Sequence, residues 1–340
     1  MKKILCLALS IILALSVLAL VSCNTGSNDN TDDENKTPDQ VETLKMGLGV
    51  HVSTTATNAD GDKNGQGNAV ITVATVTVDK DGKIVACAID VADNTVKYTY
   101  DGKAISEESF KTKYEMGSSY GMVQYAGSAK EWFEQADAFC TLVKGKTVDE
   151  VKALVVNGDK GNDDVIAAGC TITVNEFVLA IEKACKNAAE SNATSANTLK
   201  LGIYTEQTAS DADGDKKGTN EIETTIFACA VDADGKIVAA VADCVAVEFT
   251  FDANGASTYD ATKAVVSKRE AGDAYGMVQY AGSAKEWYAQ ADAFAAKCIG
   301  KKVGDVSSLM DDKGYGSEDV KGAGCTIVVM GFVKAASKIK

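Results

Sequence analysis

Runs of apolar, β-branched residues separated by short polar turns predict strands in the first half of the chain. Val70–Val78 reads VITVATVTV, which is rich in β-branched residues, as is typical of a strand. The turn-forming residues Asp79–Gly82 follow, and Lys83–Val91 is again mostly apolar. Val96–Tyr100 is a third such run. Together these runs predict an antiparallel meander.

The same order returns in the second half of the chain. Similar runs cover Thr224–Val231, Lys236–Val245 and Val247–Phe251, and a DADG turn separates the first two. A second meander of the same kind is therefore expected.

Apolar residues at helical spacing follow each meander. Ser128 and Glu131 form a capping-box pattern, and Gly145 ends the apolar run that begins there. Ser283 and Glu286 are the equivalent pair in the second half. Strands followed by helices indicate the α+β class.

Further helices are expected in both halves. The capping-box pair Thr147 and Glu150 predicts a short helix. The amphipathic segments Phe177–Lys186 and Phe332–Ile339 predict a closing helix in each half.

The two halves are copies of one unit. Tyr120–Trp132 and Tyr275–Trp287 both read YGMVQYAGSAKEW, an offset of 155 residues that becomes 153 in the meander. We therefore expect one repeat at 44–189, a polar linker at 190–198 and a second repeat at 199–340. Each repeat is long enough to bury its own core, so independent folding is expected.

The N-terminus predicts a lipid anchor. Met1–Cys23 has a basic start, an apolar stretch and small residues before Cys23, which resembles a bacterial lipobox with Cys23 as the lipidation site. An ordinary signal peptide or a membrane helix is the alternative. Residues 24–43 are mostly polar and predict a disordered tether. The expected location is extracytoplasmic, with the protein lipid-anchored to the bacterial cell membrane.

The charge and the cysteines exclude some functions. Loss of Lys2 and Lys3 with the signal would change the net charge from −14 to −16, which argues against nucleic acid as a partner. Eight cysteines remain beyond Cys6 and Cys23, and only Cys170 and Cys325 are equivalent in the two repeats. We expect mostly free thiols that pack as small apolar side chains.

Histidine and metal chemistry are not expected. His51 is the only histidine, and Glu206 takes its place in the second repeat. The acidic segments 58–62 and 211–215 resemble calcium loops only superficially, because the later ligand positions are missing. Both are interpreted as solvated turns, and no metal site is predicted.

The duplicated block offers a candidate binding loop. Its tyrosines and glutamines precede the predicted helix and lie beside glycines, so they can offer aromatic faces and hydrogen bonds to a planar ligand. The alternative is a packed loop that leads into the helix. The candidate residues are Tyr120, Gln124, Tyr125, Tyr275, Gln279 and Tyr280.

A short cassette before each closing helix carries a family resemblance. The segments 168–171 and 323–326 both read AGCT and follow an aspartate. With the preceding strand–DGKI–strand pattern, they resemble the extracytoplasmic FMN-binding domains, whose motif is Asp-x-x-(Ser/Thr)-Gly-Ala-Thr. Ala168 and Ala323 replace the Ser/Thr of that motif, and Cys170 and Cys325 replace its alanine.

The resemblance implies a flavoprotein. Thr171 and Thr326 would carry FMN through a phosphoester installed by a flavin transferase, and Gly169 and Gly324 would let the backbone approach the phosphate. Because basic residues are not gathered near the cassette in the sequence, we expect helix N–H groups to hold the phosphate.

The function expected from these features is an anchored electron carrier with a redox partner, rather than an enzyme that transforms a substrate. Two alternatives stay open. One is an anchored module that binds a small molecule or a peptide without a cofactor, and the other is a structural surface protein.

Overall fold

The computed structural model describes residues 42–107 and 109–339. The predicted signal, Cys23 and residues 24–41 of the predicted tether lie outside these described residues. No helix in the described part is long and apolar enough to span a membrane.

The three long strands and most of the helices repeat in the same order in both halves of the chain. The first repeat comprises β1 Leu44–Thr57, β2 Gly65–Val78, β3 Ile84–Tyr98, β4 Ala104–Ile105, α1 Lys113–Met116, η1 Gly117–Tyr120, α2 Met122–Ala126, α3 Trp132–Leu142, α4 Val148–Lys152, β5 Val155–Val156, β6 Lys160–Gly161, α5 Asp163–Ala167 and α6 Asn175–Lys186. The second comprises β8 Thr198–Ser210, β9 Gly218–Val231, β10 Ile237–Phe251, α7 Lys268–Ala271, η2 Gly272–Tyr275, α8 Met277–Ala281, α9 Trp287–Cys298, η3 Val303–Leu309, α10 Glu318–Gly322 and α11 Met330–Ser337. Strand β7 Ala189–Ala193 lies between them.

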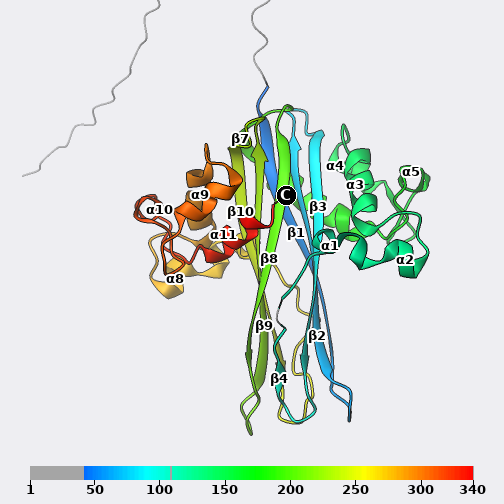
Figure 1. Ribbon diagram of the computed structural model, residues 1–340, viewed down its shortest axis with the longest axis vertical. Helices are drawn as coiled ribbons and strands as arrows, with labels where there is room; N and C mark the ends of the chain where they lie inside the picture. Colours follow the sequence, from blue (N-terminus) through cyan, green and yellow to red (C-terminus); the bar gives the residue numbers. More distant parts are fainter. Residues whose placement is uncertain (1–41, 108, 340) are drawn as a thin grey trace, which may run out of the picture. The chain divides into compact units, whose positions relative to one another are not determined.

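Two antiparallel sheets form the centre of the fold, with helices on either side (Figure 1). The first sheet has the strand order β4-β3-β2-β1-β7, and the second has the order β10-β9-β8. Helices α3 and α6 pack on the first sheet, whereas α9 and α11 pack on the second. The α+β class expected from the sequence is confirmed.

Each repeat has an outer core between its sheet and its helices. In the first repeat Phe139 and Ile181 are fully buried against β2 and β3. In the second, Phe227 and Phe294 occupy the same layer, with their ring centroids 6.4 Å apart. These outer cores fix the helices that surround the candidate site.

A third core lies between the two sheets and belongs to both repeats. Leu48 and Ile71 of the first repeat pack there with Ile226 and Phe249 of the second. Because β2 and β9 are covered on both faces, most of their residues are buried, which explains their continuous β-branched composition. The shared core argues against the expectation that each repeat folds alone.

Polar contacts also join the repeats across this core. Asn94 is buried and donates to the hydroxyls of Thr205 and Thr224 at 3.3 and 3.2 Å. Two equivalent ion pairs cross between the repeats, Lys183–Glu270 and Lys338–Glu115, each with a nitrogen–oxygen distance of 2.7 Å.

The segment expected to be a polar linker contains strand β7. Its residues pair antiparallel with the start of β1, where Lys45 lies opposite Glu190 and Met46 lies opposite Ala189. The pairing explains why a polar segment is ordered, because its backbone completes the edge of the first sheet.

The structure corrects the number of strands in the meanders. The expected strands 83–91 and 96–100 are one long strand, β3, and between them the buried Asn94 bonds into the shared core. β1 and β8 were not expected, and each pairs along its length with the next strand.

The helix caps are partly as expected. The capping box of Thr147 and Glu150 is confirmed at the start of α4. The start predicted at Ser128 is wrong, because α3 begins at Trp132 with Glu131 as its N-cap, and α9 likewise begins after Glu286.

Candidate functional site

The duplicated block folds as a short helix, which corrects the expected loop. In the first repeat Gly121 and Gly127 have φ values of 81° and 64° and end the five-residue helix α2 on either side. These left-handed conformations favour glycine. The Glu131 carboxylate accepts the N–H groups of Met122 and Val123 at 2.9 and 3.3 Å, and Glu286 does the same for α8.

A buried glutamine ties this block to the cassette. Gln135 Oε1 accepts both the N–H and the hydroxyl of Thr171, at 2.8 and 3.0 Å. Its Nε2 donates to the Ser128 hydroxyl and the Lys130 carbonyl, each at 3.0 Å. Gln290 makes the same four bonds in the second repeat. Each glutamine lies 36 residues before its threonine in the sequence, so these bonds join the duplicated block and the cassette into one site.

The cassette turns sharply at its glycine. Gly169 and Gly324 have φ values of 91° and 96°, so a side chain there would be strained. The following cysteines, Cys170 and Cys325, are buried, and burial raises the pKa of each thiol to about 11. The next residues, Thr171 and Thr326, are exposed.

Lysines lie on the cassette, contrary to the expectation from the sequence. A Cβ atom at Gly169 would come within 2.3 Å of Lys130 Nζ. In the second repeat Lys285 Nζ donates to the Ala323 carbonyl at 3.0 Å. Both lysines come from the duplicated block, so only the folded chain brings them to the cassette.

The closing helices begin beside these threonines without side-chain caps. Neither α6 nor α11 has a side chain bonded to the N–H groups of its first turn. In α6 such groups are donors for an anion, and the helix dipole adds to the attraction; in α11 the Met330 N–H already donates to the Gly314 carbonyl at 3.1 Å.

Equivalent pockets flank the cassette in the two repeats. The first has a volume of about 360 Å³ and the second about 290 Å³. Residues 155 positions apart line both of them, so the pocket was duplicated with the chain. The shared lining residues of the first pocket are Lys113, Tyr120, Met122, Trp132, Ile172 and Phe177.

Each pocket holds a lysine against two aromatic rings. Lys113 Nζ lies 5.4 Å from the ring centroid of Tyr120 and 6.0 Å from that of Trp132. Lys268 Nζ lies 5.7 Å from each of the equivalent rings. Burial opposes the charge on Lys268, but Cys244 and Glu223 raise its pKa above the ordinary value. The pocket therefore offers a cation and flat aromatic surfaces together.

The counter-charges of the two pockets differ. Lys113 pairs with Asp93 at 3.6 Å, whereas Lys268 pairs with Glu223 at 2.9 Å. Glu176 lines the first pocket and accepts the hydroxyls of Ser53 and Thr72, each at 3.2 Å. Gly331 stands at the equivalent position in the second pocket. The two pockets therefore have equivalent aromatic and apolar lining residues but different acidic residues near the lysine.

Only some of the candidate residues of the duplicated block line the pockets. Tyr120 and Tyr275 line the two pockets. Tyr125 and Tyr280 are 79% and 78% exposed and lie outside the pocket linings, as do Gln124 and Gln279. The sequence interpretation missed Lys113 and Lys268, although a lysine retained at the 155-residue offset was a usable signal.

The cysteines, His51 and the acidic side chains are the other residues considered in the sequence. The eight cysteines in the described residues are free thiols, as expected. Burial lowers the pKa of the half-buried His51, and the nearby Glu176 partly offsets this effect. Within residues 42–107 and 109–339, no group of acidic, histidine and cysteine side chains is arranged to hold a metal ion.

Comparison with known proteins finds no matching family model, no similar curated protein and no similar solved structure.

Proposed function

We propose that the protein carries one FMN in each repeat and acts as an extracytoplasmic electron carrier. The observation that carries the proposal is the duplicated pocket. In the first repeat it places two aromatic rings and a lysine together with the exposed Thr171, and in the second Ile327, the residue after Thr326, lines the equivalent pocket. Aromatic walls suit a planar ring system, and a lysine suits an anionic one. A volume of about 360 Å³ lies in the range of ligand sites.

The threonine is the residue best suited to attachment. A phosphoester needs an accessible oxygen, and Thr171 lines the pocket with its side chain exposed. The adjacent Cys170 is buried, and its raised pKa keeps the thiol protonated at neutral pH. Thr326 and Cys325 differ in the same way. In both repeats the threonine is therefore accessible, whereas the thiol of the neighbouring cysteine is buried.

The surrounding groups fit a phosphate and a ring system. The uncapped N–H groups of α6 and the ammonium group of Lys130 lie at the cassette and would hold a phosphate. Tyr120 and Trp132 would flank the rings, with Lys113 supplying positive charge. FMN, when bound, supplies the redox chemistry, and the protein supplies orientation and shielding from water.

The proposed location rests on the sequence. The lipobox at Cys23 would anchor the protein to the outside of the bacterial cell membrane, and the polar residues after it would serve as the tether. A flavin transferase and a redox partner are the protein partners that this function requires.

Intact mass after co-expression with a flavin transferase tests the proposal. The full chain should gain two FMN masses, and Thr171→Val and Thr326→Val should each lose one. Thr173→Val is the matched control, because Thr173 is exposed in the same pocket and should not carry FMN. A chain that gains no mass would reject covalent attachment.

A binding module without covalent cofactor is the second candidate. The cassette differs from the family motif at Ala168 and Cys170, and a transferase that requires the motif would not modify it. In that case free FMN should raise the melting temperature of the unmodified protein. Failure of both tests would favour capture of another planar anion.

A further inference from the structure

Four of the free thiols gather in the outer core of the first repeat. Cys87 of β3 and Cys140 of α3 are hydrogen-bonded to each other through their side chains. Cys185 of α6 lies near Cys87, and Cys170 of the cassette lies near Cys140. The bonded pair therefore joins the sheet to the first long helix of the repeat, where α3 packs on β3.

The bonded pair has no counterpart in the second repeat. Ala240 stands at the position equivalent to Cys87, and Ala295 at the position equivalent to Cys140. Both thiols are therefore present in one repeat and both are absent from the other. Alanine is smaller than cysteine at both places, so neither change compensates for the volume lost by the other. The joint change favours a role that needs both sulfur atoms.

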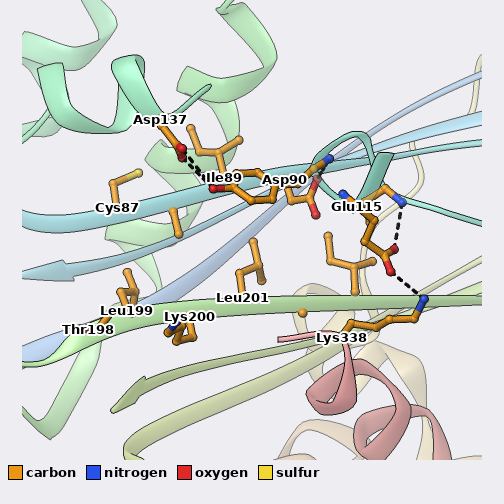
Figure 2. A pocket seen from close by; sticks show the side chains of 15 residues that line it. Cys87, Ile89, Asp90, Glu115, Asp137, Thr198, Leu199, Lys200, Leu201 and Lys338 are labelled. Atoms are coloured by element: carbon orange, nitrogen blue, oxygen red, sulfur yellow. Dashed lines mark hydrogen bonds and ion pairs between the residues drawn. The ribbon is translucent and has the colours of Figure 1, made fainter. Parts of the chain in front are cut away.

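Cys87 is the member of the pair that a reagent can reach. It is half-buried and lines a pocket of about 260 Å³ between β3 and β8, whereas Cys140 is buried. Figure 2 shows the Cys87 side chain on the same side of β3 as Asp137 of α3. A reagent that enters the pocket would therefore meet Cys87 first, with Cys140 behind it.

We propose that Cys87 and Cys140 are a modification site, at which a low-molecular-weight disulfide oxidises the two thiols to a disulfide bond between β3 and α3. The Cys87 thiol loses its proton, and its sulfur attacks the reagent, which releases one thiol and leaves a mixed disulfide. Cys140 then loses its proton, attacks the Cys87 sulfur and releases the second thiol. The protein loses two electrons and two protons, and one reagent disulfide becomes two thiols.

The surroundings of the pair determine how readily the bond forms. The hydrogen bond with Cys140 and burial raise the pKa of Cys87, so the thiol is protonated at neutral pH and exchange is slow in the folded chain. Disulfides persist in oxidising compartments outside the cytoplasm, which agrees with the proposed location. A slowly formed, lasting link is therefore expected.

The linked helix belongs to the candidate site of the first repeat. Helix α3 also carries Gln135, which holds Thr171 of the cassette. A link at Cys140 would fix α3 on the sheet, so oxidation should stabilise this site and leave the second site unchanged. The link forms whether or not the site carries FMN.

Peptide mapping of the full chain after treatment with oxidised glutathione tests the proposal. Because exchange is slow, treatment lasts for hours with the reagent in excess, and remaining thiols are blocked before digestion. Trypsin places Cys87 in the peptide 84–97 and Cys140 in the peptide 131–144, with no other cysteine in either. The expected product is a disulfide-linked pair of these peptides, which dithiothreitol separates.

The second repeat supplies a matched control pair. Cys229 and Cys298 lie near each other in its outer core and are fully buried, so the reagent should not reach them. Their peptides, 218–236 and 298–301, should stay unlinked under the same treatment. An equal yield of both links would show that the reagent enters when the core opens, which contradicts a site at the pocket.

Melting separates this link from other oxidation of the chain. The link should raise the melting temperature by about 5 °C, because it closes a loop in the unfolded chain. The control is the double variant Cys87→Ala and Cys140→Ala, which has the residues of the second repeat and should fold. Oxidised glutathione should not change its melting temperature, and an equal rise would assign the effect to other thiols.

Two results of the mapping would overturn the proposal. One is a chain in which 84–97 and 131–144 stay unlinked, or in which Cys87 carries only glutathione. The other is a link from Cys87 to Cys185, in the peptide 184–186, in place of the link to Cys140.

Discussion

Replacing Gln135 with leucine should loosen the cassette from the duplicated block. Gln135 is 1% exposed and makes four hydrogen bonds, two to Thr171 and two to the segment before α3. Leucine keeps most of the apolar volume, so the cavity contribution is small. The variant therefore reports mainly on lost hydrogen bonding.

The expected loss of stability follows from the surroundings of the four partners. A hydrogen bond contributes about 0.5–1.5 kcal/mol net, and a buried group left without a partner costs about 1–3 kcal/mol. Thr171 is exposed and regains bonds to water, whereas Ser128 and Lys130 are half-buried. We expect a loss of about 2–3 kcal/mol in the free energy of unfolding.

Urea unfolding of the Gln135→Leu chain measures this loss. Gln290→Leu should cost a similar amount because its bonds are the same. Gln135→Glu should cost at least as much: it keeps the oxygen that accepts from Thr171, but it buries a carboxylate and places an acceptor against the Lys130 carbonyl. A Gln135→Leu chain within 0.5 kcal/mol of the original, less than about one net hydrogen bond, would refute the reasoning.

Three further predictions concern the fold. Burial raises the pKa of Asp90 to about 7, while an unfolded aspartate titrates near about 4. The contribution of Asp90 to stability should therefore be full below pH about 4 and be lost as the pH rises to about 7, and Asp90→Asn should remove this part of the pH dependence in urea unfolding at different pH values. Residues 44–189 and 199–340 expressed separately should fail to melt cooperatively, because each exposes its half of the shared core; two cooperative melts would contradict this. Gly49→Ala should lower the melting temperature, since its Cβ would lie 2.1 Å from the Ala180 carbonyl oxygen, and an unchanged value would show that α6 can shift freely.

Local signals explain what the sequence predicted of the fold. The β-branched composition of 70–78 and the capping box at Thr147 depend on neighbouring residues, and both correspond to elements in the structure. Strand β1 was missed because its sequence contains Gly47 and Gly49, which weaken a strand signal. These glycines are needed by a distant segment, because α6 packs directly on the backbone of β1.

The site was predictable only in part for the same reason. The threonine cassette and Tyr120 stand out in the sequence, but the contact of Gln135 with Thr171 depends on tertiary structure. The same holds for Lys130, which is remote from Gly169 in sequence and lies on it in the fold. The core between the sheets was not predicted, although the continuous β-branched run at 70–78 is typical of a strand that is buried on both faces.

The absorbance spectrum and intact mass of the protein purified from its own host test the central claim most directly. Flavin carriage predicts absorbance in the flavin bands and two added FMN masses per chain. A colourless protein without added flavin mass, whose melting temperature free FMN does not change, would contradict it.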